Sequence, residues 1–265
     1  MIYLDQVSHR YPSQPDGEFT FQDVSLSIGR NQFVTVVGLS GCGKSTLLSL
    51  LAGLEFAEQG TLLINETQVS GPDPATSMMF QQPTLLPWIS VIKNVLFPLK
   101  ISHSDLVSGR IRALELLSLC GLEAVANALP HQLSGGMQQR VALCRALISN
   151  PALLLMDEPF GALDALTREI MGKELLKLRQ QQPHTVVMVT HSIEEATLLS
   201  DQVVIMAVKP CRIRRIINIT QAHPRDPTDP AVIAHARIIR DCIFEAETGP
   251  SPFAANQHTG TSRSS

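Results

Sequence analysis

The sequence predicts an α/β fold, in which a core of alternating strands and helices carries an antiparallel β region and an inserted helical region. Short apolar runs of buried-strand length occupy residues 32–37 and 151–156 and mark the core. Strand and helix patterns alternate again over residues 151–222. Between the two runs, from about residue 89 to about residue 128, the apolar spacing becomes helical, which predicts the insert.

The antiparallel region is predicted by residues 2–70, where short apolar runs alternate with turns. The clearest strands are residues 2–4, 20–28 and 60–64. We expect these strands to wrap around the core strand at residues 32–37.

The order of these patterns divides the chain. An amphipathic helix predicted over residues 110–119 belongs to the insert, and a proline-rich turn pattern followed by a helix over 231–244 closes the chain. We expect a core with its antiparallel β region at 1–82 and 151–222, a helical region at 83–150, a connector and helix at 223–245, and a disordered Ser-, Thr- and Gly-rich tail at 246–265.

A glycine-rich loop follows the first core strand, with the sequence GLSGCGKS over residues 38–45. A short apolar helix that ends at Gly53 comes next, so the order is strand, loop and helix, as a phosphate-binding P-loop requires. Glycines let backbone N–H groups turn toward phosphate oxygens, and the helix N-terminus adds partial positive charge. In such a loop Lys44 reaches the β and γ phosphates and Ser45 offers a hydroxyl to Mg²⁺.

Two adjacent carboxylates, Asp157 and Glu158, follow the second core strand. The carboxyl ends of strands are where open α/β sheets bind ligands. Adjacent carboxylates are costly there unless a cation or a catalytic role holds them. We expect Asp157 to face Mg²⁺ and Glu158 to face the attacking water. Capping of the next segment is the alternative role for this pair.

A third motif, LSGGMQQR over residues 133–140, lies between the P-loop and the acidic pair. Apolar residues at helical spacing follow its glycines, so Ser134 lies at a helix N-terminus, which is an anion site. Taken alone, the motif could also be a serine cap with flexible glycines.

The three motifs in this order resemble the ATP-binding subunit of ATP-binding cassette (ABC) transporters. The resemblance covers residues 1 to about 245. It implies a P-loop NTPase core of the RecA-like type that binds ATP and Mg²⁺ and hydrolyses ATP. It also implies that Ser134, Gly135 and Gly136 of one copy complete the ATP site of a second copy, in a head-to-tail dimer with twofold symmetry.

The resemblance gives roles to four further residues. Gln81 would contact Mg²⁺ and the lytic water, Asp164 would lie in a loop that crosses the dimer interface, His191 would contact the γ-phosphate, and Tyr11 would stack on adenine. Without the family, they are a polar loop residue, a helix N-cap, a histidine at a strand end and a strand aromatic.

The complete predicted site combines the motifs with these four residues. The residues expected to act in hydrolysis are Glu158, His191 and Gln81, and those expected to hold Mg²⁺ are Ser45, Gln81 and Asp157. The residues expected to bind ATP are Tyr11, Gly38, Ser40, Gly41, Cys42, Gly43, Lys44, Ser45, Thr46, Ser134, Gly135, Gly136 and Asp164.

Four local features resemble the importer branch for nitrate, sulfonate, taurine and related small solutes. They are the segment LLPW at 85–88, Met137 in the third motif, THSIEEA at 190–196, and KPCRI at 209–213 followed by PRDP at 224–227. That branch usually has glycine where Cys211 stands, so we expect a turn with positive φ there. The features do not distinguish the solute.

The importer resemblance implies specific partners and a location. The loop after Gln81, including Trp88, and the helical insert would contact integral membrane permease subunits, and a solute-binding protein would act indirectly. The chain would lie peripherally on the cytoplasmic face of the inner membrane.

Composition limits the other possibilities. The 265 residues carry a formal net charge of -3, which gives no indication of nucleic-acid binding. No apolar run approaches the roughly 18 residues of a membrane span, and no signal-peptide pattern opens the chain. The five cysteines lack a C-x-x-C pair, so we expect reduced buried thiols.

Other functional classes fit less well. A soluble ABC ATPase acting on nucleic acid or ribosomes is the main alternative, but such chains usually carry two cassettes or a long coiled coil. A GTPase would need an Asn-Lys-x-Asp motif, which the sequence lacks. A non-hydrolysing cassette is disfavoured by the intact Lys44, Asp157, Glu158 and His191. Export shares these motifs with import, and the branch features favour import.

Overall fold

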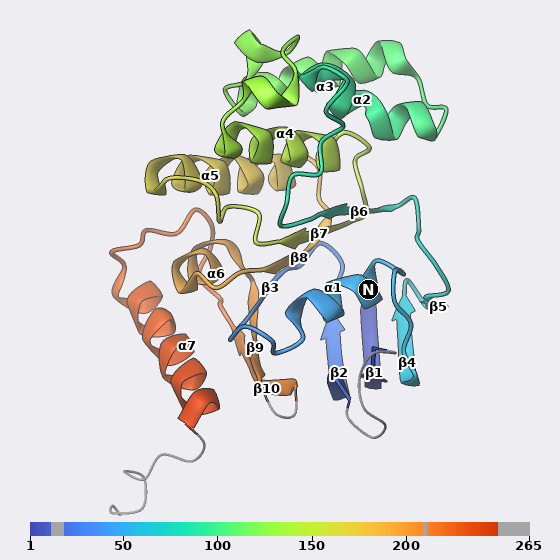
Figure 1. Ribbon diagram of the computed structural model, residues 1–265. Helices are drawn as coiled ribbons and strands as arrows, with labels where there is room; N and C mark the ends of the chain where they lie inside the picture. Colours follow the sequence, from blue (N-terminus) through green and yellow to red (C-terminus); the bar gives the residue numbers. More distant parts are fainter. Residues whose placement is uncertain (12–18, 209–210, 249–265) are drawn as a thin grey trace, which may run out of the picture.

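The computed structural model describes residues 1–11, 19–208 and 211–248, with side chains described as far as residue 245. Figure 1 shows two sheets, with a group of helices packed above the larger one. The larger sheet has the strand order β10 (Arg212–Asn218), β9 (Gln202–Ala207), β3 (Phe33–Gly38), β8 (Thr185–Val189), β7 (Leu153–Asp157) and β6 (Thr76–Met79).

The larger sheet is parallel from β9 to β6, and β10 pairs antiparallel at its edge. All residues of β3 and β8 are buried, as are all but the last residue of β7. Parallel strands are covered on both faces, which explains why their sequences are nearly continuous apolar runs. The two runs that predicted the core, residues 32–37 and 151–156, form β3 and β7.

The smaller sheet is antiparallel and lies beside helix α1 (Figure 1). Its β1 pairs with β2 on one side and β4 on the other, and Ile2 faces both Ile28 and Ile64 in register. Its strands are β2 (Phe21–Ile28), β1 (Ile2–His9), β4 (Gln59–Ile64) and β5 (Thr67–Gln68). The predicted strands at 2–4, 20–28 and 60–64 lie within or within one residue of these elements.

Helix α1 (Lys44–Leu51) joins the two sheets. Its leucines Leu47, Leu48, Leu50 and Leu51 are buried in a cluster that includes Val36 of β3 and Leu4 of β1. Helix α1 is apolar on almost every face, as expected for a helix that is surrounded by protein. Both sheets therefore pack against α1 and fix the position of the P-loop that precedes it.

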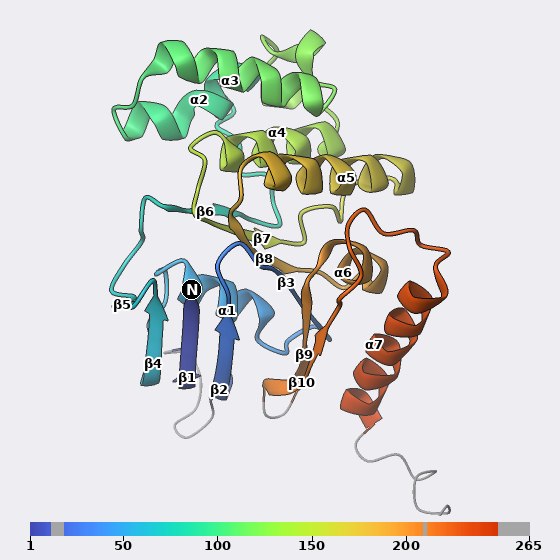
Figure 2. The ribbon, with the colours of Figure 1, turned by 180° about the vertical axis from the view of Figure 1, so that it is seen from behind.

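The helical region lies over the β6 edge of the larger sheet (Figures 1 and 2). Its apolar core is continuous with the face of the sheet, because one cluster holds Val95, Leu117 and Val141 together with Phe33 and Met188. The elements are α2 (Val91–Ile101), α3 (Leu106–Leu119), the short 3₁₀ turns Glu123–Val125 and Pro130–Gln132, and α4 (Gly135–Leu147). The remaining helices are α5 (Ala165–Gln181), α6 (Ile193–Leu199) and α7 (Pro230–Thr248).

Helix boundaries differ from the sequence prediction in two places. Helix α3 begins at Leu106 rather than at residue 110, because Asp105 caps it by accepting hydrogen bonds from the Val107 and Ser108 amides. Helix α7 continues to Thr248, so the predicted disordered tail does not begin at residue 246. The sequence there, Ala246-Glu247, contains good helix formers before Gly249-Pro250. The rest of the predicted tail, 249–265, lies outside the described residues.

Helix α7 packs against α6 and β9, as Figure 2 shows. The connector before α7, residues 223–229, is fixed by the buried Arg225. Its guanidinium is surrounded by main-chain carbonyl oxygens. It donates to the carbonyls of Thr197 and Ser200 at the end of α6 and to those of Ile219 and Gln221 after β10. One side chain thus joins the last strand of the sheet to α6.

None of the described helices combines the length and the apolar character needed to cross a membrane. All five cysteines lie in the described part of the chain, are buried, and none is joined in a disulfide.

The Arg225 cluster generates a stability prediction. Arg225→Met removes four hydrogen bonds to main-chain carbonyls, three of them buried, so we expect the free energy of unfolding to fall by about 3 kcal/mol. Urea unfolding of the full chain measures the change. Arg214→Met, which replaces an exposed arginine of β10, is the matched control and should change stability by less than about 0.5 kcal/mol. Equal effects of the two substitutions would contradict the role of Arg225.

Candidate functional site

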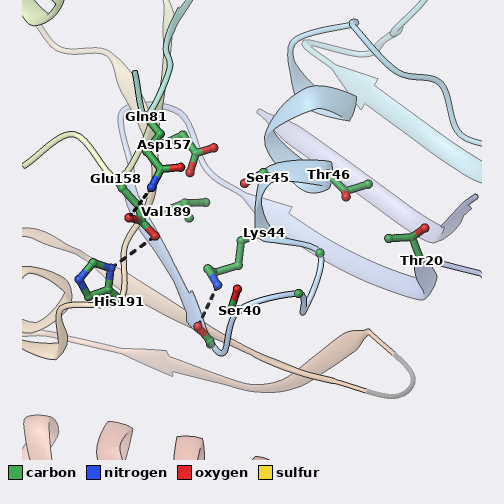
Figure 3. Close-up of a pocket in the computed structure, with 13 residues that line it drawn as sticks. Thr20, Ser40, Lys44, Ser45, Thr46, Gln81, Asp157, Glu158, Val189 and His191 are labelled. Atoms are coloured by element: carbon green, nitrogen blue, oxygen red, sulfur yellow. Dashed lines mark hydrogen bonds and ion pairs between the residues drawn. The ribbon is translucent and has the colours of Figure 1, made fainter. Parts of the chain in front are cut away.

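The strand ends of the larger sheet surround a cavity of about 440 Å³. Strands β3, β7, β8 and β6 deliver the P-loop, Asp157 and Glu158, His191 and Gln81 to this one place (Figure 3). The lining residues are Thr20, Gly38, Ser40, Gly41, Gly43, Lys44, Ser45, Thr46, Gln81, Asp157, Glu158, Val189 and His191.

The P-loop bends through backbone conformations that favour glycine. Gly43, at φ 85°, is the N-cap of α1, and no side chain caps the helix there. Its left-handed conformation turns the chain into α1 while leaving the first amides of the helix without a side-chain acceptor. Gly38 has φ 155°, and a Cβ there would lie 2.6 Å from the Met206 carbonyl oxygen. The loop can therefore offer backbone donors to an anion in the cavity.

Lys44 lies at the base of the loop and is 9% exposed. Its ammonium donates to the carbonyl oxygens of Gly38 and Leu39, at 2.9 and 2.7 Å, and lies 3.7 Å from the Cys42 sulfur. Figure 3 shows the side chain turned back toward the loop. The positive charge is thus held at the cavity by the loop itself, ready to meet phosphate oxygens.

Asp157 and Ser45 lie next to each other in the lining of the cavity (Figure 3). Burial raises the pKa of the Asp157 carboxyl, while the hydrogen bond from Ser45 and the charge of Lys44 act in the opposite direction. A hydroxyl and a partly buried carboxylate are ligands that suit Mg²⁺, which binds oxygen. No cluster of three His, Cys, Asp or Glu side chains occurs among the described residues, but Mg²⁺ needs only one or two carboxylates when phosphates supply other oxygens.

Glu158 is held by three contacts. Its Oε2 accepts from Gln81 Nε2 at 3.1 Å, and its Oε1 lies 3.4 Å from His191 Nδ1. Its backbone N–H donates to the Val189 carbonyl at 2.9 Å. Its φ of 47° is in the left-handed region, which a side chain as large as glutamate rarely adopts. Strain of this kind persists where the surroundings fix it, and it aims the carboxylate into the cavity.

His191 lies in a turn after β8 that side-chain hydrogen bonds stabilise. Thr190 Oγ1 accepts from the Ser192 amide and donates to Glu195 Oε2 at 2.6 Å. The other oxygen of Glu195 lies 3.4 Å from Nε of Arg168 on α5. The His191 side chain itself is 70% exposed, so its backbone is fixed while its ring is accessible.

Tyr11 and Cys42 were also predicted to bind the nucleotide. The Tyr11 hydroxyl lies 3.2 Å from Thr46 Oγ1, beside the cavity, and its ring meets His9 edge to face. Its stacking on adenine stays a prediction. Cys42 is fully buried behind the loop, so only its backbone can face a phosphate.

The third motif does not line the cavity. Ser134 caps α4 by accepting from the Met137 amide, and Asp164 caps α5 by accepting from the Thr167 amide and hydroxyl. The two segments are adjacent, because a Cβ on Gly136 would lie 3.2 Å from Leu163 Cδ2. Within one chain, Ser134, Gly135, Gly136 and Asp164 are therefore separate from the residues of the cavity.

Cys211 contacts the P-loop from behind, and its sulfur donates to the Gly41 carbonyl at 3.2 Å. The predicted positive φ at Cys211 depends on the carbonyl carbon of residue 210, which lies outside the described residues.

Sequence reasoning missed Thr20 and Val189 as lining residues, and it missed Gln139 and Arg145, which bind the loop after Gln81. Thr20 and Val189 lie at the ends of predicted strands, where the side-chain direction has no local signal. Gln139 and Arg145 form contacts across the fold that helical spacing does not predict.

Comparison with known proteins agrees with this geometry. A family model described as ABC transporter matches residues 21–161. The chain is 43% identical over 207 residues to the taurine import ATP-binding protein TauB of Pelagibacter ubique, covering 77% of this chain and 78% of that protein. It is 37% identical over 227 residues to the aliphatic sulfonates import ATP-binding protein SsuB of Bacillus thuringiensis, covering 86% of this chain and 89% of that protein.

A solved structure confirms the predicted fold class. The chain matches the dimeric structure of a post-hydrolysis state of the ATP-binding cassette MJ0796 bound to ADP and Pi. The TM-score is 0.75 at 33% identity, and the match covers 84% of this chain and 100% of that one. With the P-loop, the acidic pair and the parallel sheet in place, the chain belongs to the ABC transporter family and is one of its ATPases.

Proposed function

We propose that two copies of this chain bind two ATP molecules between them and use ATP hydrolysis to energise uptake of a small solute through a membrane permease. The observation that carries the proposal is that the predicted ATP-binding residues form two separate groups within one chain. The cavity holds the P-loop, Glu158 and His191, whereas Ser134 stands at a separate helix N-terminus of the same chain. A head-to-tail pair would bring the two parts together twice. The dimeric cassette at TM-score 0.75 supports this arrangement.

Each part of the cavity has a role in this proposal. Lys44 and the loop amides bind the β and γ phosphates, and Tyr11 and Thr46 lie on the side expected to meet the nucleoside. Ser45, Asp157 and Gln81 would hold Mg²⁺. When bound, this ion neutralises charge on the phosphates.

Glu158 is the group that would orient the attacking water. Gln81 and His191 each contact one of its carboxylate oxygens, so the carboxylate is fixed on both sides. A general base needs this kind of positioning before its basicity matters. His191 remains accessible and would contact the γ-phosphate, and Ser134 of the second copy would bind that phosphate at a helix N-terminus.

The loop after Gln81 is suited to contact a permease. Trp88 is 73% exposed, an unusual state for an aromatic side chain of this size. The backbone beside it is rigid, because the fully buried Asn94 accepts from the Leu86 amide and donates to the carbonyls of Leu86, Ile89 and Ser90. A large exposed apolar group on a fixed loop indicates a binding surface.

The names of the relatives support a direction of transport and a class of solute. Proteins named for taurine import and aliphatic sulfonate import match more than three quarters of this chain. We therefore propose import of nitrate, a sulfonate, taurine or a similar small solute, with a separate solute-binding protein making the choice. The chain would act at the cytoplasmic face of the inner membrane as a peripheral subunit.

The first prediction of the proposed function concerns Glu158. Glu158→Gln keeps the shape of the side chain and removes the base, so we expect ATP binding to remain and hydrolysis to fall by about a hundredfold or more. Steady-state phosphate release measures turnover, and equilibrium dialysis with ATP measures binding. Glu169→Gln, at an exposed position of α5, is the control. Turnover of Glu158→Gln near that of wild type would remove Glu158 from this role.

The second prediction tests the shared site. Ser134→Arg places a large cation at the helix N-terminus, so we expect the chain to bind ATP through its own P-loop but not to hydrolyse it. Mixing it with Glu158→Gln should then restore turnover. In a mixed dimer one site has the intact Glu158 of one copy and the intact Ser134 of the other.

Random pairing of the two variants predicts recovery of at most about one quarter of wild-type turnover, because half the dimers are mixed and each has one complete site. Recovery must depend on the mixing ratio and disappear when either variant is alone. Failure of the mixture to hydrolyse ATP, with both variants folded and able to bind ATP, would contradict the shared site.

A further inference from the structure

The loop between β6 and α2 carries Gln81, and Gln81 donates to Glu158 inside the cavity. The loop is therefore linked to the cavity through the contact between these two side chains. Its backbone, however, is not held by the sheet. Its first part, residues 81–84, is held by α4, the helix that begins beside Ser134, whereas Asn94 of α2 holds the later part at residues 86–90.

Arg145 of α4 provides the principal contact. Its Nη2 donates to the Pro83 carbonyl at 2.8 Å and to Thr84 Oγ1 at 3.0 Å, and its Nη1 donates to the Thr84 carbonyl at 2.9 Å. A guanidinium is a planar fork that fixes the orientation of its acceptors, which a lysine ammonium cannot do. Three hydrogen bonds from one fork define the path of two successive residues.

The backbone conformation of Thr84 indicates that contacts with other segments determine the course of the loop. Its φ is 45°, in the left-handed region where a β-branched residue is rare. Such a conformation is costly and persists only where neighbouring groups determine it. Arg145 binds both the carbonyl and the hydroxyl of Thr84, so it is well placed to determine it.

A second residue of α4 binds the same loop closer to the site. Gln139 is buried, and its Nε2 donates to the Gln81 carbonyl at 3.4 Å. In the described structure its buried Oε1 has no hydrogen-bond partner. Helix α4 thus contacts the loop at Gln81 and again at residues 83–84.

We infer that Arg145 is a positioning residue that couples the two ATP sites of the dimer. This inference rests on the proposed function, because Ser134 must serve the second copy. Helix α4 has 13 residues and is about 20 Å long, so a shift of the loop at Arg145 is carried to Ser134 by one rigid element. The contact of Gln81 with Glu158 in one site thereby adjusts the position of Ser134 in the other. Such coupling acts equally in both directions.

The test compares three full-length variants with a matched control. Arg145→Lys keeps the charge but loses the fork, Thr84→Ala removes the hydroxyl acceptor, and Thr84→Ser retains it. The control is Arg112→Lys, because Arg112 of α3 also donates to α4, at the Leu147 carbonyl, and to Gln182, but does not touch the loop. Two quantities are measured: the dependence of turnover on ATP concentration, and hydrogen exchange of the backbone over residues 81–86 without ATP.

We expect wild type and Arg112→Lys to hydrolyse ATP with a Hill coefficient near 2, the number of sites, and Arg145→Lys to have a coefficient near 1. Exchange in the loop should rise about tenfold in Arg145→Lys, with maximal turnover falling by a similar factor, because an ammonium cannot make the three directed hydrogen bonds of the guanidinium. Thr84→Ala should change in the same direction by a smaller factor. Thr84→Ser should behave as wild type, and an isolated copy of every variant should bind ATP with unchanged affinity.

Two outcomes would overturn the inference. If loop exchange rises in Arg145→Lys while the Hill coefficient stays near 2, Arg145 supports only local structure. If Arg112→Lys lowers the coefficient as much as Arg145→Lys, the effect is general loosening of the helical region. Wild-type turnover without cooperativity would also overturn the inference, because the two sites would then have no coupling for Arg145 to carry. The shared site of the proposed function is tested separately, by mixing Ser134→Arg with Glu158→Gln.

Discussion

Parallel pairing of β3, β8, β7 and β6 is the constraint on which the site depends. Val36 of β3 lies opposite Val189 of β8, Val189 lies opposite Asp157 of β7, and Met156 lies opposite Met79 of β6. Because parallel strands end on the same edge, the next residues of all four meet there. Close packing on both faces holds this register, because a shift by one residue would exchange Phe33, which packs with the helical region, for Val34, which packs with α1. The catalytic geometry is thus a consequence of core packing.

The residues of the site differ in what holds their backbone. Some are fixed by the two sheets and their adjoining turns, and Gln81 is fixed by the helical region. The P-loop is fixed by α1 and by Lys44, and the turn that carries His191 is fixed by Thr190 and Glu195. Gln81 instead lies on a loop that is bound to the helical region through Arg145. In the coupling that we infer, this loop would transmit a change at the γ-phosphate position to the helices. The main carriers are hydrogen bonds to backbone carbonyls, whose geometry is directional.

Much of this could be predicted from the sequence, because short motifs encode it locally. The P-loop, Asp157 and Glu158 each follow an apolar strand, so their chemistry and position are predicted together. Other features have no local signal. The left-handed backbone of Glu158 depends on its amide bonding to Val189, and the contact of Arg145 with Pro83 joins residues 62 positions apart. Helix α7 extends beyond its predicted end because turn-forming residues begin only at Gly249. Contacts between distant segments are decided by packing, which periodicity does not describe.

The central claim is that each ATP is bound by the P-loop of one copy and by Ser134 of the other. A structure of the Glu158→Gln chain crystallised with Mg²⁺ and ATP tests it most directly. The account predicts a twofold dimer with two ATP molecules, in which the γ-phosphate of each contacts Lys44 of one copy and the Ser134 end of α4 of the other. ATP bound in the cavity of an isolated copy, with Ser134 facing solvent and no second copy at the phosphate, would contradict it.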